Sequence, residues 1–128
     1  MRLDEIKNEI SKINNYLKNC LWMDFEICEM SFIKIEVAGR IDRSINDFSI
    51  SIEFNQPYLV YGLLTWGLDN SKEFISLAKP SEFIEFNKRY RIEQGKYLFR
   101  INMEDFDEGI YIAASDVKCV IYKENPFD

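Results

Sequence analysis

The stretch LDEIKNEISKINNYL, residues 3–17, decides the fold class, because its apolar residues recur with a helical period that the rest of the chain lacks. The charged residues fall off this stripe, with acids earlier and bases later, as the helix dipole favours. We therefore predict an amphipathic helix over residues 3–19. The stripe lasts barely two heptads, which favours packing on a sheet over a coiled-coil seam and leaves both a monomer and a homodimer open. The stripe consists of Leu3, Ile6, Ile10, Ile13 and Leu17.

Beyond Cys20 the apolar period changes to two, which is typical of strands with one side facing water. In DFSISIEF, for example, Ser49, Ser51 and Glu53 alternate with apolar residues and should face solvent. Short strands at this close spacing indicate a mainly antiparallel sheet. The strand-like segments are SFIKIEVAG (31–39), DFSISIEF (47–54), KYLFRINM (96–103), GIYIAA (109–114) and VKCVIYK (117–123).

Two further segments have less regular patterns. YLVYGLLTW, residues 58–66, is apolar throughout, so it is either a central strand covered on both faces or a strand that crosses between two layers. SEFIEFNK, residues 81–88, fits either a short helix capped by Ser81 or another strand. The sequence thus predicts a single α+β domain over residues 1–128. It has an N-terminal helix packed on a sheet of about seven or eight short strands, arranged as a sandwich or a partly closed barrel.

Composition narrows the class of protein. Three scattered cysteines in a chain of 128 residues, with no metal-binding spacing, favour reduced thiols and argue against a structural metal. The first residues carry acids where an export signal needs an apolar core, and the longest apolar run is too short to span a membrane. We expect a cytoplasmic protein that needs no cofactor and does not contact membranes.

The net charge of −6 disfavours nucleic acid as a partner, because binding to phosphates depends on an excess of Lys and Arg. One basic stretch, NKRYRIEQGKYLFR at residues 87–100, does interleave aromatic and basic residues as single-strand binders do. Its two-residue alternation and the turn-like EQGK favour a hairpin instead, with aromatics toward the core and charges toward water.

The chemical inventory argues against an enzyme. The sequence has no histidine, which removes the usual nucleophile–base pairs, and its five glycines are too scattered for a phosphate-binding loop. A mechanism that uses carboxylates alone stays possible, since it needs only two acids at the correct separation. Such acids would come from the strands, and the candidates are Glu26, Glu29, Glu36 and Glu53.

The densest group of acids lies in NMEDFDEGIY, residues 102–111. An EF-hand loop starting at Glu104 would place Phe106 and Ser115 where ligands are required, so the calcium motif fails. Three interpretations remain: an irregular cation site at which two strand ends bring carboxylates together, a solvated turn between strands, and a patch for a basic partner. We take Glu104, Asp105, Phe106, Asp107 and Glu108 as candidate partner-binding residues. Phe106 discriminates between a patch and a simple turn, because an exposed Phe106 among the acids would favour the patch.

A second candidate for partner binding is the turn-rich segment TWGLDNSKE, residues 65–73. Trp66 and Asp69 are its candidate contact residues, although a tryptophan is more often a core residue.

The stretch LWMDFEICEMSFIKIEV, residues 21–37, resembles an aromatic-x-Asp-x-Glu-Ile strand entry found in some immunity proteins of bacterial polymorphic toxin systems. Asp24 and Glu26 correspond to the acids of that pattern, whereas Met23 stands where the family has histidine. The resemblance implies a small cytosolic α+β domain that inhibits a toxin by covering it.

These observations predict a protein-binding module without catalytic activity, specifically a toxin-neutralising immunity protein that covers a basic partner surface. The alternative is a β-rich domain that binds a small ligand in an apolar cavity of roughly 300 Å³ or more. The third possibility is a carboxylate-only enzyme, which requires two acids with different pKa values in one cleft.

Overall fold

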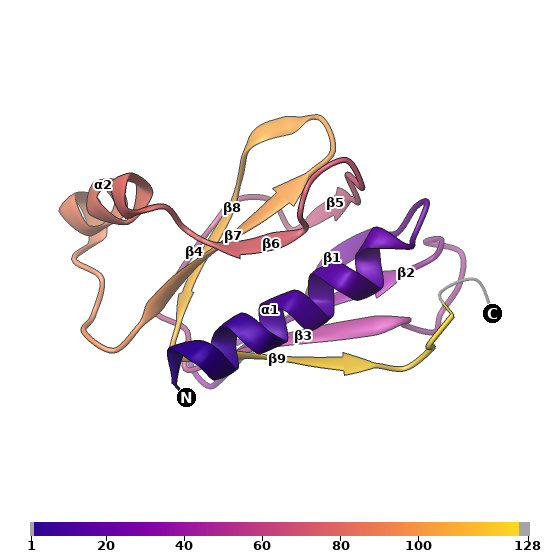
Figure 1. Cartoon of the computed structure of the whole chain (residues 1–128), viewed down its shortest axis with the longest axis horizontal. Helices are drawn as coiled ribbons and strands as arrows, with labels where there is room; N and C mark the ends of the chain where they lie inside the picture. The colour runs from indigo at the N-terminus through magenta and orange to yellow at the C-terminus, as the bar shows by residue number, and fades with distance from the viewer. Residues whose placement is uncertain (1, 126–128) are drawn as a thin grey trace.

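The computed structural model describes residues 2–125 and shows an α+β fold with an N-terminal helix and two antiparallel sheets (Figure 1). The fold class predicted from the sequence is therefore confirmed. The described residues form nine strands instead of seven or eight, three of them only three residues long, and a second helix. The elements are α1 (Leu3–Lys18), β1 (Asp24–Met30), β2 (Lys34–Arg40), β3 (Ile50–Asn55), β4 (Leu59–Tyr61), β5 (Thr65–Gly67), β6 (Ile75–Leu77), α2 (Pro80–Tyr90), β7 (Tyr97–Met103), β8 (Phe106–Ala114) and β9 (Asp116–Ile121).

The strands form two open sheets, which we call sheet A, in the order β5-β1-β2-β3-β9, and sheet B, in the order β4-β8-β7-β6. Neither sheet closes on itself, so the barrel alternative is wrong. The two sheets share one apolar core, in which Phe54 of β3 meets Phe99 of β7 edge to face at 5.3 Å between ring centroids. Phe25 and Phe74 lie in the same core, 4.4 Å apart.

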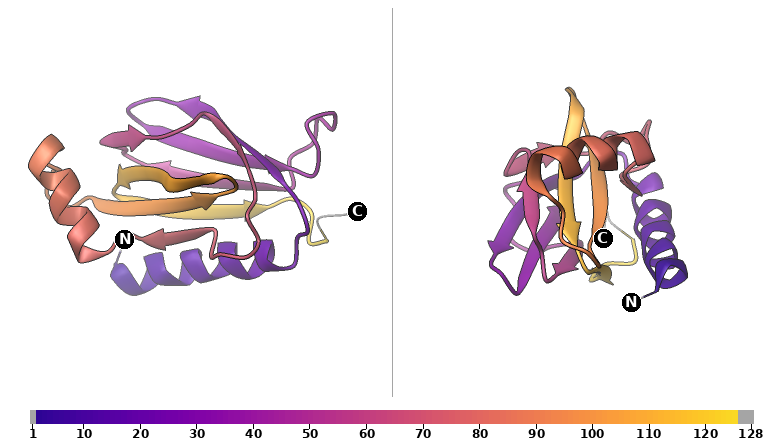
Figure 2. Two further views of the ribbon diagram at one scale, coloured as in Figure 1. Left: turned by 90° about the horizontal axis from the view of Figure 1, so that it is seen from above. Right: turned by 90° about the vertical axis from the view of Figure 1, so that its left-hand side faces the viewer.

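Helix α1 runs along the open side of the two sheets, next to β9 of sheet A and β6 of sheet B (Figure 2). Its stripe points inward, with Ile6, Ile13 and Leu17 buried. The Asn14 side chain bonds both backbone groups of Ile75 on β6: the amide nitrogen donates to the carbonyl at 2.8 Å, and the oxygen accepts the Ile75 N–H at 3.0 Å. The helix thereby covers an edge that would otherwise expose unpaired backbone groups.

Helix α2 covers the outer face of sheet B, where Phe86 packs with Leu98 and Tyr111 in a second apolar cluster. Lys79 rather than Ser81 precedes the first turn, and its backbone N–H donates to the Glu82 carboxylate at 2.9 Å. The same carboxylate accepts a hydrogen bond from Arg100 at 2.6 Å and another from the Tyr111 hydroxyl. One acid thus fastens α2 to β7 and β8.

The helix also corrects the prediction of a hairpin over residues 87–100. Residues 87–90 form the last turn of α2, which ends at Arg91 in the left-handed conformation, and the strand begins only at Tyr97. The basic residues Lys88 and Arg89 therefore lie on an exposed helix, not on a strand. The helical alternative for SEFIEFNK is the correct one.

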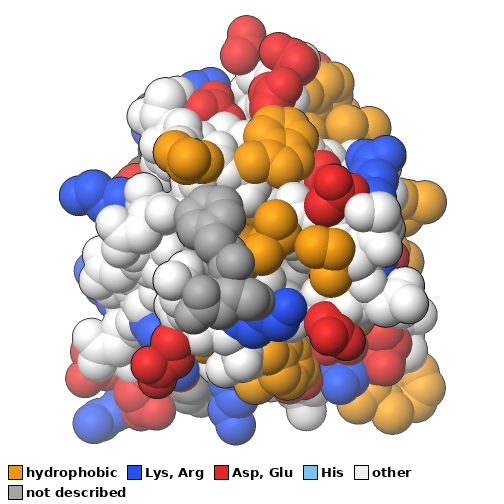
Figure 3. All heavy atoms as spheres, turned by 90° about the vertical axis from the view of Figure 1, so that its right-hand side faces the viewer, with side chains coloured by type: hydrophobic (Ala, Val, Ile, Leu, Met, Phe, Trp, Pro, Cys, Tyr) orange, Lys and Arg blue, Asp and Glu red, His pale blue; other side chains and the backbone are white. Residues whose placement is uncertain are grey.

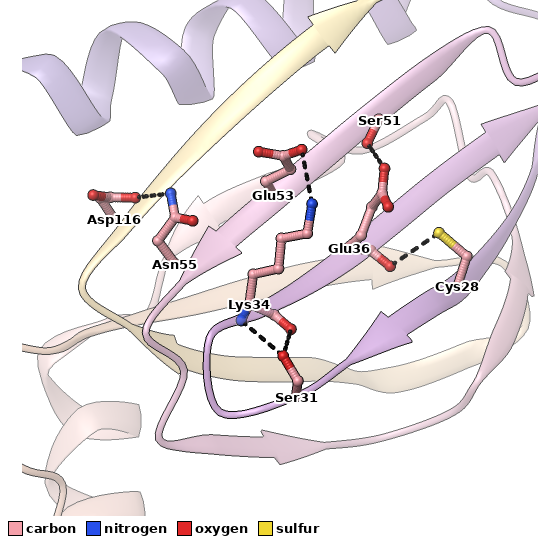
Figure 4. Close-up of polar contacts among 8 residues, drawn as sticks. All are labelled: Cys28, Ser31, Lys34, Glu36, Ser51, Glu53, Asn55 and Asp116. Atoms are coloured by element: carbon pink, nitrogen blue, oxygen red, sulfur yellow. Dashed lines mark hydrogen bonds and ion pairs between the residues drawn. The ribbon is translucent and has the colours of Figure 1, made fainter.

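Two other strand predictions need correction. Ser49 and Ser51 are fully buried instead of facing water, and Ser51 donates its hydroxyl to Glu36 on the neighbouring strand (Figure 4). The segment YLVYGLLTW crosses between layers, since it supplies β4 to sheet B and β5 to sheet A. Of the two alternatives offered for this segment, the crossing strand is confirmed.

Replacement of Asn14 by alanine should destabilise the protein. The change removes two hydrogen bonds and leaves the Ile75 backbone groups unpaired, which costs about 1–3 kcal/mol of unfolding free energy. The neighbouring Asn15 is exposed, so Asn15→Ala is a matched control that should change stability by less than about 0.5 kcal/mol. Urea unfolding of both variants measures the difference, and equal effects would contradict the role of Asn14.

Stability should also depend on pH through Glu82. Partial burial raises the pKa of this carboxyl, but hydrogen bonds from Tyr111, the Lys79 amide and Arg100 outweigh it and hold the pKa below the ordinary value of 4.5. The stabilisation is therefore fully present above that value and lost as pH falls through the lower folded pKa. Thermal unfolding at pH 7 and at pH 3 should show a larger loss for the natural protein than for Glu82→Gln. Equal losses of stability in the natural protein and in Glu82→Gln would contradict this role of Glu82.

Candidate partner-binding surface

The acidic segment forms the tip of the β7–β8 hairpin. Met103 pairs with Phe106, so the turn contains only Glu104 and Asp105, and Asp105 adopts a positive φ of 59° that an aspartate tolerates. The segment is therefore a turn between two strands, but a shorter one than the sequence suggested. Asp107 and Glu108 lie within β8, with their side chains exposed.

Phe106 is half-buried and packs against the main core. It does not stand exposed among the acids, which was the arrangement that would have made it a contact residue for a partner. Its packing instead fixes the hairpin tip, so that Glu104, Asp105, Asp107 and Glu108 project into solvent from a rigid support.

The hairpin tip belongs to sheet B, yet it touches the edge of sheet A. The backbone N–H of Glu104 donates to the carbonyl of Gly67 on β5 at 3.2 Å. The backbone N–H and C=O of Gly67 point away from β1, because it is the backbone groups of its neighbours Trp66 and Leu68 that face β1. This contact brings the two segments predicted as separate partner sites, residues 65–73 and 104–108, to one place.

Asp69 lies next to Glu104, and the two carboxyls differ in their electrostatics. Hydrogen bonds from the Ser71 hydroxyl and backbone lower the pKa of Asp69, with a smaller contribution from Lys72. Partial loss of hydration and the nearby charges of Asp105 and Asp69 raise the pKa of Glu104. The ion pairs of Lys72 with Asp69 and Asp107 are both long, at 3.9 Å, and the Lys72 ammonium is exposed to solvent, so they relieve little of this repulsion.

Trp66 does not face solvent. Only 4% of the residue is exposed, and its ring stacks on Phe25 at 6.0 Å. The side chain is part of the core and is not available to a partner in this structure. Asp69, three residues further on, keeps its place in the candidate surface.

Sequence reasoning missed Trp22. This residue is 40% exposed, and the benzene part of its indole lies against the backbone of Gly67. The indole N–H donates to the carboxylate of Asp24 at 3.1 Å, and Asp24 pairs with Gly67 across β1 and β5. Two signals in the sequence could have found it: Trp22 is the aromatic of the strand-entry pattern around Asp24, and a glycine inside a strand often marks a close approach.

We call the region defined by these residues the acidic corner. Figure 3, which shows the right-hand side of the molecule as drawn in Figure 1, has acidic side chains gathered at the top and apolar side chains directly below them. The acidic corner consists of Trp22, Asp24, Asp69, Glu104 and Asp105, together with Asp107, which shares Lys72 with Asp69, and Glu108, which follows Asp107 on β8.

The carboxylates considered for catalysis lie on strands β1–β3 of sheet A. Glu26 forms an ion pair with Arg40 at 2.5 Å. Figure 4 shows the other two contacts: Glu53 pairs with Lys34 at 3.4 Å, and Glu36 accepts the Ser51 hydroxyl. Glu29 is exposed. Asp69 and Glu104 do have unmatched pKa values, but Glu104 is exposed at a hairpin tip and not within a cleft.

The hollows on the surface differ from the enclosed apolar cup that a small-ligand function predicts. One of about 280 Å³ lies between α1 and the segment before β6, with Leu17, Leu68 and Phe74 beneath a polar rim. Another of about 410 Å³ is lined by residues 46–48 and 122–123, most of which are polar. Neither lies between the two sheets, where the core is filled by aromatic and aliphatic side chains.

Within residues 2–125, the structure contains no cluster of three or more His, Cys, Asp or Glu side chains placed to hold a metal ion. The same residues include no helix that is long and apolar enough to cross a membrane. Comparison of the chain with protein-family models, curated proteins and solved structures finds no match. The resemblance to immunity proteins therefore stays a prediction.

Substitution of Gly67 by alanine should displace Trp22. A Cβ atom at this position would lie 2.5 Å from the Trp22 ring, which is closer than carbon atoms pack, so the half-exposed indole must move. The indole N–H signal of Trp22 in an NMR spectrum should shift as its bond to Asp24 breaks. The control Thr65→Ala, at an exposed position of the same strand, should leave that signal in place. An unmoved Trp22 signal in Gly67→Ala would show that the ring does not rest on Gly67.

Proposed function

We propose that this protein is a binding module that covers a basic surface of another protein through the acidic corner. The observation that carries the proposal is the contact between Glu104 and Gly67, which brings the exposed acids of the β7–β8 hairpin next to the edge of sheet A and the half-buried Asp69. Opposite charge on a partner would raise the rate of encounter and align the two surfaces.

The electrostatics of Glu104 support this proposal. Its pKa is raised first by partial loss of hydration and then by the nearby carboxylates of Asp105 and Asp69, whose repulsion the free protein does not relieve. A cationic group placed between these carboxylates would relieve it, so binding a basic partner gains energy at this site in particular. Acids elsewhere in the protein, such as Glu82 and Glu26, already have cationic partners of their own.

We further propose that the partner is a toxin and that the protein is its cytoplasmic immunity protein. The support is the resemblance of residues 21–37, in which Asp24 belongs to the acidic corner and Glu26 pairs with Arg40 instead. Inhibition of this kind requires a covering surface and no catalytic group in the inhibitor. Asp24 would thus serve as a contact residue, since its carboxylate already holds Trp22 in place.

Removal of charge at the hairpin tip should abolish capture of the partner. The test variant combines Glu104→Gln, Asp105→Asn, Asp107→Asn and Glu108→Gln, which keeps side-chain shape, and Asn tolerates the positive φ at position 105. The natural protein and this variant are each used as bait for lysate and secreted fractions of the source cells at low salt. A basic protein retained by the natural chain should be lost by the variant.

A matched control removes the same charge elsewhere. Asp4, Glu29, Glu85 and Glu93 are exposed and lie outside the acidic corner, so their amide variants should retain the partner. Loss of the partner in both variants would reduce the effect to net charge. Retention by the hairpin variant would move the interface to another surface.

A further inference from the structure

The contact between the Trp22 ring and Gly67 is unusual for an arrangement that serves only to stabilise the fold. Glycine weakens a strand, and the φ angle of Gly67 is not among the positive values that require glycine. What requires the missing side chain is the Trp22 ring, which occupies the space of a Cβ atom. Yet the ring so accommodated remains 40% exposed, so the arrangement fixes an aromatic surface in solvent instead of burying it.

Two contacts restrict the orientation of the ring. The backbone of Gly67 supports its benzene part, and the Asp24 carboxylate holds its N–H at 3.1 Å. An aromatic ring with so little freedom loses little conformational entropy when a partner packs on it, which is the property of an anchor residue in an interface. Leu21 beside it is 78% exposed and extends the apolar area.

The surroundings of the ring select a cation. Asp24 contacts the indole directly, and Glu104 with Asp69 lies at the far side of Gly67. An aromatic face attracts positive charge, and neighbouring carboxylates strengthen that preference. We propose that Trp22 binds an arginine side chain of the basic partner, with the guanidinium against the exposed indole and its N–H groups directed to the adjacent Asp24 carboxylate. This inference rests on the proposed function, because it specifies the partner of the same corner.

Arginine fits this site better than lysine for reasons of shape and hydration. The guanidinium is planar, so it can lie flat on a ring while its edge donates two parallel hydrogen bonds to a carboxylate. The ammonium of lysine is compact and more strongly hydrated, which makes it costlier to place against an indole. Both carry one charge, so the ratio of their affinities separates stacking on Trp22 from general attraction to the acids.

The test uses a short peptide of alternating arginine and glycine and its lysine counterpart, titrated at low ionic strength into the ¹⁵N-labelled protein. The arginine peptide should bind about fivefold more tightly than the lysine peptide, as expected for a cation–π contact of about 1 kcal/mol. The Trp22 indole signal should move, whereas the signal of buried Trp66 should not.

Variants at position 22 complete the experiment. Trp22→Leu keeps an apolar side chain without a ring and should make the two peptides bind equally, whereas Trp22→Phe keeps a ring and should retain most of the difference. An unchanged Trp66 signal confirms that each variant is folded. Equal binding of both peptides to the natural protein, or a preference that survives in Trp22→Leu, would overturn the role of Trp22 and leave the basic-partner function standing. Binding of neither peptide would overturn both.

Discussion

The free edges of two open sheets are the constraint around which this structure is arranged. An uncovered edge exposes backbone groups that pair readily with other chains, so each edge needs a partner within the fold. Helix α1 covers the edge of β6 through the hydrogen bonds of Asn14. It covers the edge of β9 through Lys12, whose ammonium donates to the Cys119 carbonyl at 3.3 Å. The β7–β8 hairpin serves β5 through the Glu104 amide. The bond that covers β5 also assembles the acidic corner, so the candidate site follows from a requirement of the fold.

The acids of this protein fall into two groups with opposite electrostatic behaviour. Glu82, between Arg100 and Tyr111, has a lowered pKa and holds a helix to a sheet. Glu104, beside Asp105 and Asp69, has a raised pKa and holds no other element through its carboxylate among the contacts described above. Charge that is compensated stabilises the fold, whereas charge that is left in mutual repulsion is available to a partner. This contrast distinguishes the acidic corner from the acids of sheet A, where Glu26 and Glu53 pair with Arg40 and Lys34.

Periodicity predicted the local structure well and the long-range structure poorly. The 3.6-residue stripe located α1, and alternation located β2, β3, β7, β8 and β9, because both patterns record which side of an element meets the core. Alternation says nothing about which sheet a strand joins, so β8 and β9, separated by Ser115 alone, could not be assigned to different sheets. Leu98 is buried against Phe86 of α2, a contact between distant residues that alternation within the strand does not reveal. Asp69 was identified as a candidate from its turn-rich segment, but its proximity to Glu104 depends on a contact between residues that are distant in sequence. The exposure of Trp22 and the burial of Trp66 also depend on such long-range contacts.

One backbone hydrogen bond, from Glu104 to Gly67, joins the hairpin of sheet B to the edge of sheet A and so creates the acidic corner. Scalar coupling across hydrogen bonds, measured by NMR on the isotope-labelled protein, detects that bond directly. A coupling between the Glu104 amide nitrogen and the Gly67 carbonyl carbon is predicted, alongside the couplings within the β7–β8 ladder that serve as an internal standard. Ladder couplings without the one between Glu104 and Gly67 would mean that the hairpin tip is free of β5, and the acidic corner would not exist as a single surface.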